Sequence, residues 1–198
     1  MDINVTLIAG SSQECSQSAK VAGYLSERLA ALGISAMPQI IDLGSRPLPL
    51  WPTHHDDNTW ENYRTQLLHA DALIVITPEW HGMACPAVKN LFVYAGYAEL
   101  AHKPALLVGI SSGLGGTYPL SELRASSYKN SRICYLPEQL VIRQVTNVMN
   151  EPIPIDENDM RIRRRADWAL EILGEYAHSM SGLRTRIHLD NNDFTNGM

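Results

Sequence analysis

Short apolar runs that alternate with amphipathic helical patterns constrain the fold of this chain more than any other feature. The stronger runs cover residues 5–9, 72–76 and 104–110, and weaker ones cover residues 34–43 and 140–142. Each run leads through a loop into a stretch whose apolar residues recur three and four positions apart, as is typical of a half-buried helix. Strict alternation of this kind requires a parallel sheet with helices on both faces and right-handed crossovers.

The expected helices begin with recognisable start signals. Ser16 is positioned to cap the first helix, and Asn58 with Glu61 resembles a capping box for the second. Pro86 fits the first position of the third helix, and residues 156–159 place acids at the start of the long last helix. Five strand–helix units predict a flavodoxin-like, doubly wound five-stranded parallel sheet of order 2-1-3-4-5. In such a sheet a cofactor binds where the strand order reverses, between the first and third strands.

Length, charge and cysteine content narrow the class of protein. The 198 residues suffice for one well-buried domain, and a net charge of −5 argues against a general nucleic-acid binder. Cys15, Cys85 and Cys134 are an odd, widely spaced set, which fits a reducing compartment better than a disulfide framework. No secretion signal is recognisable at the start, and no apolar run approaches the roughly 18 residues needed to span a membrane. We expect a cytoplasmic protein with a single domain over residues 1–182 and a polar, unstructured tail over residues 183–198.

The loop after the first strand offers hydroxyl groups beside a helix start. Gly10 permits a tight turn, and Ser11, Ser16 and Ser18 lie next to the free amides of the helix N-terminus. This combination suits a phosphate group. A plain polar turn with Ser16 as a simple cap is the other interpretation that the loop by itself leaves open.

Cys15 in the same loop raises the hypothesis of a phosphatase. Such a loop needs an arginine shortly after the nucleophilic cysteine to hold the phosphoryl oxygens. The matching position is Val21, and the neighbouring Lys20 lacks the bidentate geometry of an arginine. The sequence therefore argues against a phosphatase.

Two further loops follow strands in the same way. The short loop from Pro78 to Pro86 must direct its peptide groups at water or at a flat ligand with donors and acceptors on its edge. His81 and Cys85 lie in it, but no second His/Cys pair is near enough for zinc. The loop of residues 111–117 has three glycines in four positions, which indicates close approach of its backbone to another group. Its spacing differs from a Gly-x-Gly-x-x-Gly dinucleotide fingerprint.

Two charged segments are interpreted as solvated. Residues 54–57, His-His-Asp-Asp, precede a helix start that favours acids, so we expect a solvated loop and no metal site. Arg161, Arg163, Arg164 and Arg165 form a basic run, which we interpret as a solvated face or as donors of interface salt bridges. Contact with the 2′-phosphate of NADPH is the minor interpretation.

Three motifs in order resemble the NADPH-dependent FMN reductase family, which is related to quinone, azo and chromate reductases. The most specific is Thr77-Pro78-Glu79-Trp80 followed by Lys89-Asn90, with Trp80 where the family pattern has tyrosine. The first loop follows Gly-Ser-x-Arg-x-x-Ser-x-Asn/Ser except at the arginine, where it has Gln13. The third loop matches Ser-x-Gly-x-Gly-Gly followed by Leu123-Arg124. The resemblance covers about residues 3–142.

The resemblance implies an FMN site formed by all three loops. By position in the family pattern, the phosphate contacts are Ser11, Gln13, Ser16 and Ser18, the isoalloxazine contacts are Pro78, Glu79, Trp80 and His81, and the opposite side of the ring meets Ser112, Gly113 and Gly115. The main departure is Gln13 in place of arginine, which removes a phosphate contact of about 1.5–3 kcal/mol. We expect either weak binding of FMN or compensation by Lys20.

The implied activity is transfer of a hydride from NADPH or NADH through bound FMN to a flavin, quinone or similar small acceptor. The cofactor carries this chemistry, so we expect no catalytic side chain and no metal. The alternatives are a flavin-binding electron carrier or sensor without NAD(P)H turnover, and a relative that has lost flavin. The mild acidity of the chain favours the enzyme over the carrier.

The same resemblance implies a homodimer or homotetramer. An open flavin face in a small domain is completed by a neighbouring subunit, and Trp51, Trp60 and the segment Tyr94–Tyr97 are the candidate interface aromatics. We expect no nucleic-acid or membrane partner.

Overall fold

A parallel sheet forms the centre of the computed structural model, which describes residues 3–53 and 58–187. The strand order is β2-β1-β3-β5-β6, and all four neighbouring pairs are parallel. A two-residue strand β4, Met83–Ala84, pairs antiparallel with the end of β3. The main strands are β1 Val5–Ala9, β2 Gln39–Asp42, β3 Ala72–Trp80, β5 Pro104–Ile110 and β6 Cys134–Ile142. With β4 set aside, this is the predicted order 2-1-3-4-5.

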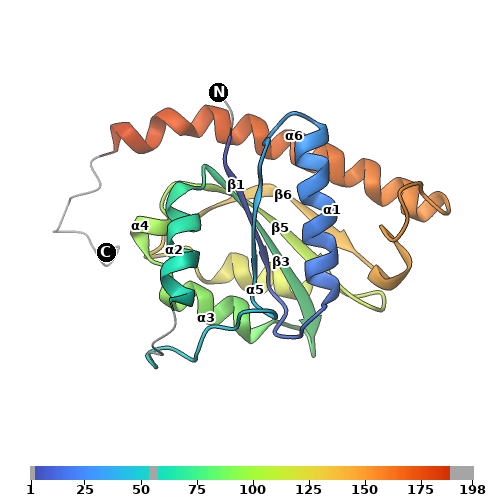
Figure 1. The fold of residues 1–198 in the computed structure, drawn as a ribbon, viewed down its shortest axis with the longest axis horizontal. Helices are drawn as coiled ribbons and strands as arrows, with labels where there is room; N and C mark the ends of the chain where they lie inside the picture. The colour runs from blue at the N-terminus through green and yellow to red at the C-terminus, as the bar shows by residue number, and fades with distance from the viewer. Residues whose placement is uncertain (1–2, 54–57, 188–198) are drawn as a thin grey trace.

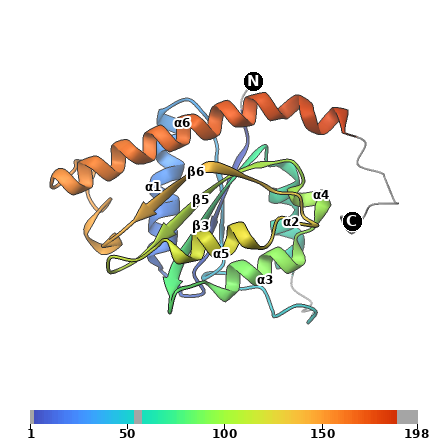
Figure 2. The same ribbon diagram turned by 180° about the vertical axis from the view of Figure 1, so that it is seen from behind.

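Helices cover both faces of the sheet, as Figures 1 and 2 show from opposite sides. Side chains of α1 and α6 pack in one hydrophobic core, and those of α2, α3 and α5 pack in the other. The helices are α1 Gln17–Ala31, α2 Thr59–His69, α3 Pro86–Tyr94, α4 Tyr97–Leu100, α5 Tyr118–Ala125 and α6 Glu157–Arg186, with a short 3₁₀ helix η1 at Val145–Asn147.

The two cores follow from the two-residue period of the strands. Leu7 of β1 and Ile74 of β3 enter the core under α1 and α6, whereas their chain neighbours Ile8 and Leu73 enter the opposite core. All four side chains are fully buried. Successive side chains of a strand point to opposite faces, so a continuous apolar run fits only a sheet covered on both sides.

Most of the predicted helix starts are confirmed. The Ser16 hydroxyl accepts a hydrogen bond from the amide of Ala19 at 3.1 Å and so caps α1. Asp156 caps α6 in the same manner, and Pro86 is the first residue of α3. The predicted capping box at Asn58 is wrong, because Asn58 precedes α2 without a side-chain cap hydrogen bond.

Several strand and helix limits differ from the expected ones. Strand β6 begins at Cys134, six residues before the apolar run, because this edge strand is only partly buried and its polar residues hide the pattern. Helix α6 runs to Arg186, so the first four residues of the predicted tail 183–198 are helical. Arg184 holds this end through a 2.6 Å ion pair with Asp71. Residues 188–198 lie outside the described part of the chain.

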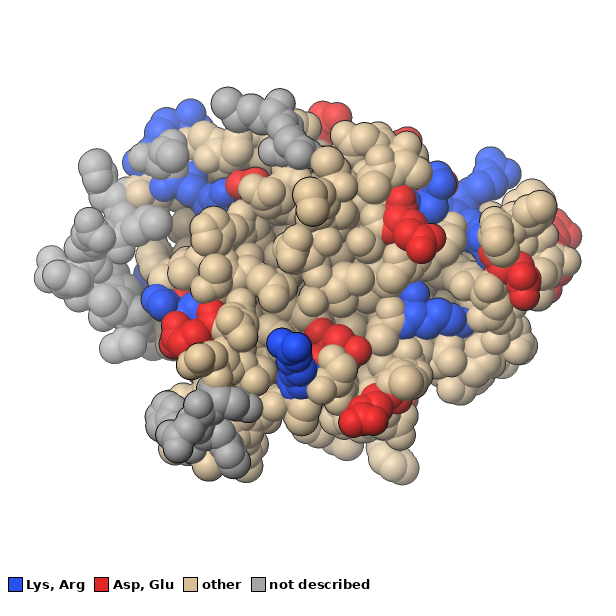
Figure 3. Space-filling view, viewed as in Figure 1, with Lys and Arg blue, Asp and Glu red and all other residues tan. Residues whose placement is uncertain are grey.

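Charged side chains lie interspersed with wide uncharged areas on the face drawn in Figure 3. Among the described residues, no helix combines the length and the apolar character needed to cross a membrane.

Candidate functional site

A cavity of about 320 Å³ opens at the carboxyl ends of β1, β3 and β5. This is where the strand order reverses, and its volume is at the low end of the range for small-molecule pockets. The lining residues are Ser11, Gln13, Ser16, Gln17, Ser18, Pro78, Glu79, Trp80, Ile110, Ser111, Ser112, Gly113 and Val145. Nine of the eleven predicted site residues are in this set, and His81 and Gly115 are not.

The first loop is held tightly against the neighbouring strand. The amide of Gly10 donates to the carbonyl of Ile76 at 2.8 Å, and a Cβ atom at Gly10 would lie 2.4 Å from that oxygen. Only glycine fits there, because any side chain would clash with the neighbouring strand. The hydroxyl of Ser11 then accepts from the amide of Gln13 at 3.1 Å, which directs the loop toward the start of α1.

Two buried polar atoms at the start of α1 have no partner within residues 3–53 and 58–187. The Ser18 side chain is 1% exposed, and its Oγ makes no hydrogen bond; Oε1 of Gln17 is in the same situation. Buried polar atoms are normally paired, because an unpaired one costs about 1–3 kcal/mol. Both residues line the cavity, where the free amides and the positive end of the helix dipole also favour an anion. These atoms fit a phosphate ester with neighbouring hydroxyl groups.

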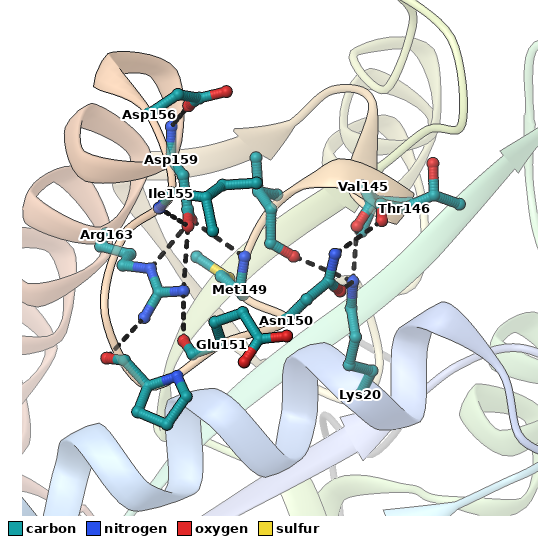
Figure 4. Close-up of polar contacts among 12 residues, drawn as sticks. Lys20, Val145, Thr146, Met149, Asn150, Glu151, Ile155, Asp156, Asp159 and Arg163 are labelled. Carbon is teal, nitrogen blue, oxygen red and sulfur yellow. Dashed lines mark hydrogen bonds and ion pairs between the residues drawn. The ribbon is translucent and has the colours of Figure 1, made fainter.

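Of the two expected consequences of Gln13, compensation by Lys20 is not the one that the structure supports. Its ammonium group donates to the carbonyls of Val145 and Val148, at 2.6 and 2.9 Å, and to Oδ1 of Asn150 at 2.8 Å (Figure 4). These bonds use all three of its donors. Burial lowers the pKa of Lys20, although Asp159 partly opposes this effect. No lysine or arginine of the described residues lines the cavity, so there an anion would be held by neutral donors and the helix dipole.

The segment that Lys20 binds is fixed from its other side by Asp159, which is fully buried. The Asp159 carboxylate accepts from the amides of Met149 and Ile155, at 2.9 and 3.2 Å, and pairs with Arg163 at 2.8 Å (Figure 4). Burial alone would raise the pKa of Asp159, but these hydrogen bonds outweigh it and lower the pKa. Together the contacts keep Val145 at the cavity wall.

Arg163 therefore corrects one interpretation of the basic run. Its side chain is buried, so it is a structural ion-pair partner and does not belong to a solvated face. Arg165 pairs with Glu138 of β6. Arg161 and Arg164 are exposed, as predicted. The segment 54–57 lies outside the described residues; across the others, no group of three metal-ligating side chains comes together.

The second loop proves to be a hairpin. Strand β3 continues to Trp80, and His81 and Gly82, with φ of 51° and 74°, turn the chain into β4. Trp80 faces Met83 across the hairpin, while His81 is exposed at its tip. His81, which was expected in the site, therefore does not line the cavity. The hairpin base is closed by the hydroxyl of Thr77, which accepts from the amide of Cys85 at 3.1 Å.

Glu122 of α5 supports this hairpin from outside the cavity. Its carboxylate accepts from the amide of Ala84 at 2.6 Å and from Nζ of Lys89 at 2.9 Å. Both bonds lower the pKa of Glu122, and the bond from the Ala84 amide has the larger effect. The Lys89 of the central motif is thus a structural residue that fixes the second loop.

Glu79 joins the second loop to the third. Its Oε2 accepts from the amide of Gly116 at 2.5 Å, and a Cβ atom at Gly115 would lie only 2.8 Å from its Oε1. The close approach of the third-loop backbone that the sequence predicted is, at Gly115, an approach to the Glu79 carboxylate.

The third loop brings in residues that the sequence had not indicated. Its Ser111 carbonyl accepts from the amide of Val145 at 3.0 Å, and its Gly113 carbonyl accepts from the amide of Gln144 at 2.9 Å. These bonds place Val145 beside Ser111 in the cavity wall. The other lining residues missed were Gln17, Ile110 and Ser111. Gln17 and Ser111 lie within predicted loops and Ile110 directly adjoins one, which was the only available signal.

Comparison with known proteins gives consistent matches. Residues 3–147 match the family model described as NADPH-dependent FMN reductase. An NADPH azoreductase of Bacillus sp. (strain OY1-2) is 26% identical over 147 residues, which cover 71% of this chain and 76% of the relative. An FMN-dependent NADPH-azoreductase of Staphylococcus aureus is 29% identical over 167 residues, covering 81% and 87%.

Solved structures share the fold. The apo form of an NADH:FMN oxidoreductase superposes with a TM-score of 0.74 at 17% identity, covering 96% of this chain and 97% of the other. An oxidoreductase from Corynebacterium diphtheriae gives 0.73 at 16% identity, covering 90% and 98%. The predicted flavodoxin-like architecture is confirmed.

Proposed function

The chain belongs to the NADPH-dependent FMN reductase family, and from that membership we propose how its cavity holds FMN and which acceptors it serves. It is an FMN-dependent NAD(P)H oxidoreductase. Bound FMN supplies the hydride chemistry, so the side chains have to bind, orient and shield.

The phosphate of FMN lies at the start of α1 in this proposal. The observation that carries it is the buried Ser18 hydroxyl, which lacks a partner in the described protein and points to a ligand. Ser11, Gln13 and Ser16 surround the same end of the cavity. Oε1 of Gln17, an unpaired acceptor, suits a hydroxyl of the ribityl chain.

The ring lies between the second and third loops. Pro78, Glu79 and Trp80 line one side of the cavity, and Ser112 and Gly113 line the other. Glu79 acts here as a positioning residue, since its carboxylate ties both loops together. His81 and Gly115 are left out of the binding set.

The acceptor in this proposal is an azo compound or a quinone. The two relatives compared above are both named as azoreductases. A flavin carrier without turnover is the competing function, because the same loops would serve it.

Steady-state oxidation of NADPH by FMN-loaded protein separates the two. With an azo dye or a quinone present, we expect rapid loss of absorbance at 340 nm that depends on added FMN. Protein that binds FMN and still fails to oxidise NADPH or NADH would be a carrier. Protein that gives no FMN-induced thermal shift would contradict the proposed site.

Self-association through the α3 side of the molecule completes the proposal, as a homodimer or homotetramer. Leu50, Trp51, Met83 and Val93 are all exposed on or next to α3, with Trp51 tied to Asn90 of that helix at 3.0 Å. Trp60 instead packs on Tyr94, with ring centroids 5.2 Å apart, within one subunit. A cytoplasmic location stays a prediction, in keeping with three free cysteines.

A further inference from the structure

A second cavity, of about 530 Å³, lies on the other side of the third loop. It runs between the edge strand β6 and the first half of α6. Its wall toward the candidate FMN cavity is thin: Gly113 and Val145 line one cavity, while their chain neighbours Leu114 and Gln144 line the other. The amide of Gln144 donates to the carbonyl of Gly113 at 2.9 Å and holds this wall together.

The second cavity is basic, although the chain as a whole carries a net charge of −5. Arg143, Arg161 and Arg165 line it, against the single carboxylate of Glu138. Glu138 is already paired with Arg165. Two guanidinium groups therefore remain without a countercharge at the groove.

The contacts of those two arginines leave their donors available. Across residues 3–53 and 58–187, Arg143 has no hydrogen bond or ion pair. Arg161 has one exposed bond, to Oδ1 of Asn158 at 3.3 Å. Arg161 shares one face of α6 with Arg165, four residues further on, but only Arg165 is paired with a carboxylate, that of Glu138. An anion in the groove would supply the countercharge that Arg161 lacks.

We propose that this groove binds the adenosine 2′-phosphate of NADPH, held by Arg143 and Arg161. The inference rests on the proposed function, because the nicotinamide end of the same dinucleotide must reach the flavin cavity across the shared wall. A phosphate monoester carries a charge of about −1.5 to −2 at neutral pH, and guanidinium groups bind its oxygens in a bidentate manner. NADH lacks this phosphate, so the groove makes the enzyme prefer NADPH.

Binding of adenosine 2′,5′-bisphosphate to the FMN-loaded protein tests the groove without turnover. Calorimetry should give tighter binding of this probe than of adenosine 5′-monophosphate. Arg143→Gln and Arg161→Gln should each weaken it by about tenfold or more, the size expected for loss of a charge-assisted bond. Binding of the monophosphate should change little.

Arg164→Gln is the matched control. Arg164 is exposed on the same helix but does not line this groove, so its substitution should leave both affinities unchanged. Equal binding of the two nucleotides, or equal effects of the Arg161 and Arg164 substitutions, would overturn the assignment.

Steady-state rates then separate this inference from the proposed function. The kcat/KM ratio of NADPH to NADH should fall about tenfold or more in Arg143→Gln and Arg161→Gln, through the NADPH value. An unchanged ratio in an active enzyme contradicts the groove alone. Failure of the wild-type protein to oxidise either nucleotide contradicts the proposed function, regardless of the affinity measured for adenosine 2′,5′-bisphosphate.

Discussion

Replacing Ser18 by alanine should change the stability of the FMN-free protein and its affinity for FMN in opposite directions. The Ser18 side chain is buried at the start of α1, and its hydroxyl has no partner in the described protein. Without FMN the hydroxyl is a cost to folding; with FMN we propose that it binds the phosphate.

The magnitudes follow from those two situations. A buried, unpaired polar group costs about 1–3 kcal/mol, so Ser18→Ala should stabilise the FMN-free protein by about 1 kcal/mol or more. For a chain of this length, that raises the melting temperature by about 2–4 °C. A hydrogen bond to a charged phosphate is worth about 1.5–3 kcal/mol, so the affinity for FMN should fall about tenfold to a hundredfold.

Ser16→Ala is the control in the same loop. The Ser16 hydroxyl already accepts from the amide of Ala19, so its removal should destabilise the FMN-free protein by about 1 kcal/mol. Urea unfolding of the FMN-free proteins measures stability, and quenching of FMN fluorescence on titration measures affinity. The reasoning is refuted if Ser18→Ala binds FMN as tightly as the wild type, or if both substitutions shift stability in the same direction.

Two further predictions concern charge. Gln13→Arg should tighten FMN binding by about tenfold in the fluorescence titration, because no described lysine or arginine lines the cavity and Lys20 is engaged elsewhere. An unchanged affinity would mean that the phosphate lies elsewhere. Burial lowers the pKa of Lys103 from 10.5 to about 8, so between these values the unfolded chain binds more protons and stability should rise with pH. The wild type should gain up to about 3 kcal/mol relative to Lys103→Met over that range in urea unfolding, and parallel curves for the two proteins would contradict this.

The apolar runs predicted the sheet well because the central strands are buried on both faces. Leu73 and Ile74 enter different cores, which leaves the sequence pattern little freedom. The edge strand β6 was harder to delimit, since it is only partly buried and its polar residues interrupt the run.

The site was predictable where a loop directly follows a strand, and less so where distant segments meet. Val145 enters the cavity through hydrogen bonds to Ser111 and Lys20, which lie 34 and 125 residues away in the chain. No local pattern encodes such a contact. His81 lies at the tip of a hairpin and does not line the cavity, because β3 extends to Trp80 and turns back, which the sequence did not reveal.

A crystal structure of the protein with FMN is the most direct test of the proposed site. We expect the phosphate within hydrogen-bond distance of the Ser18 hydroxyl, and the ring between residues 78–80 and 111–113. FMN bound with its phosphate away from the start of α1, or a cavity left empty at saturating FMN, would contradict the account.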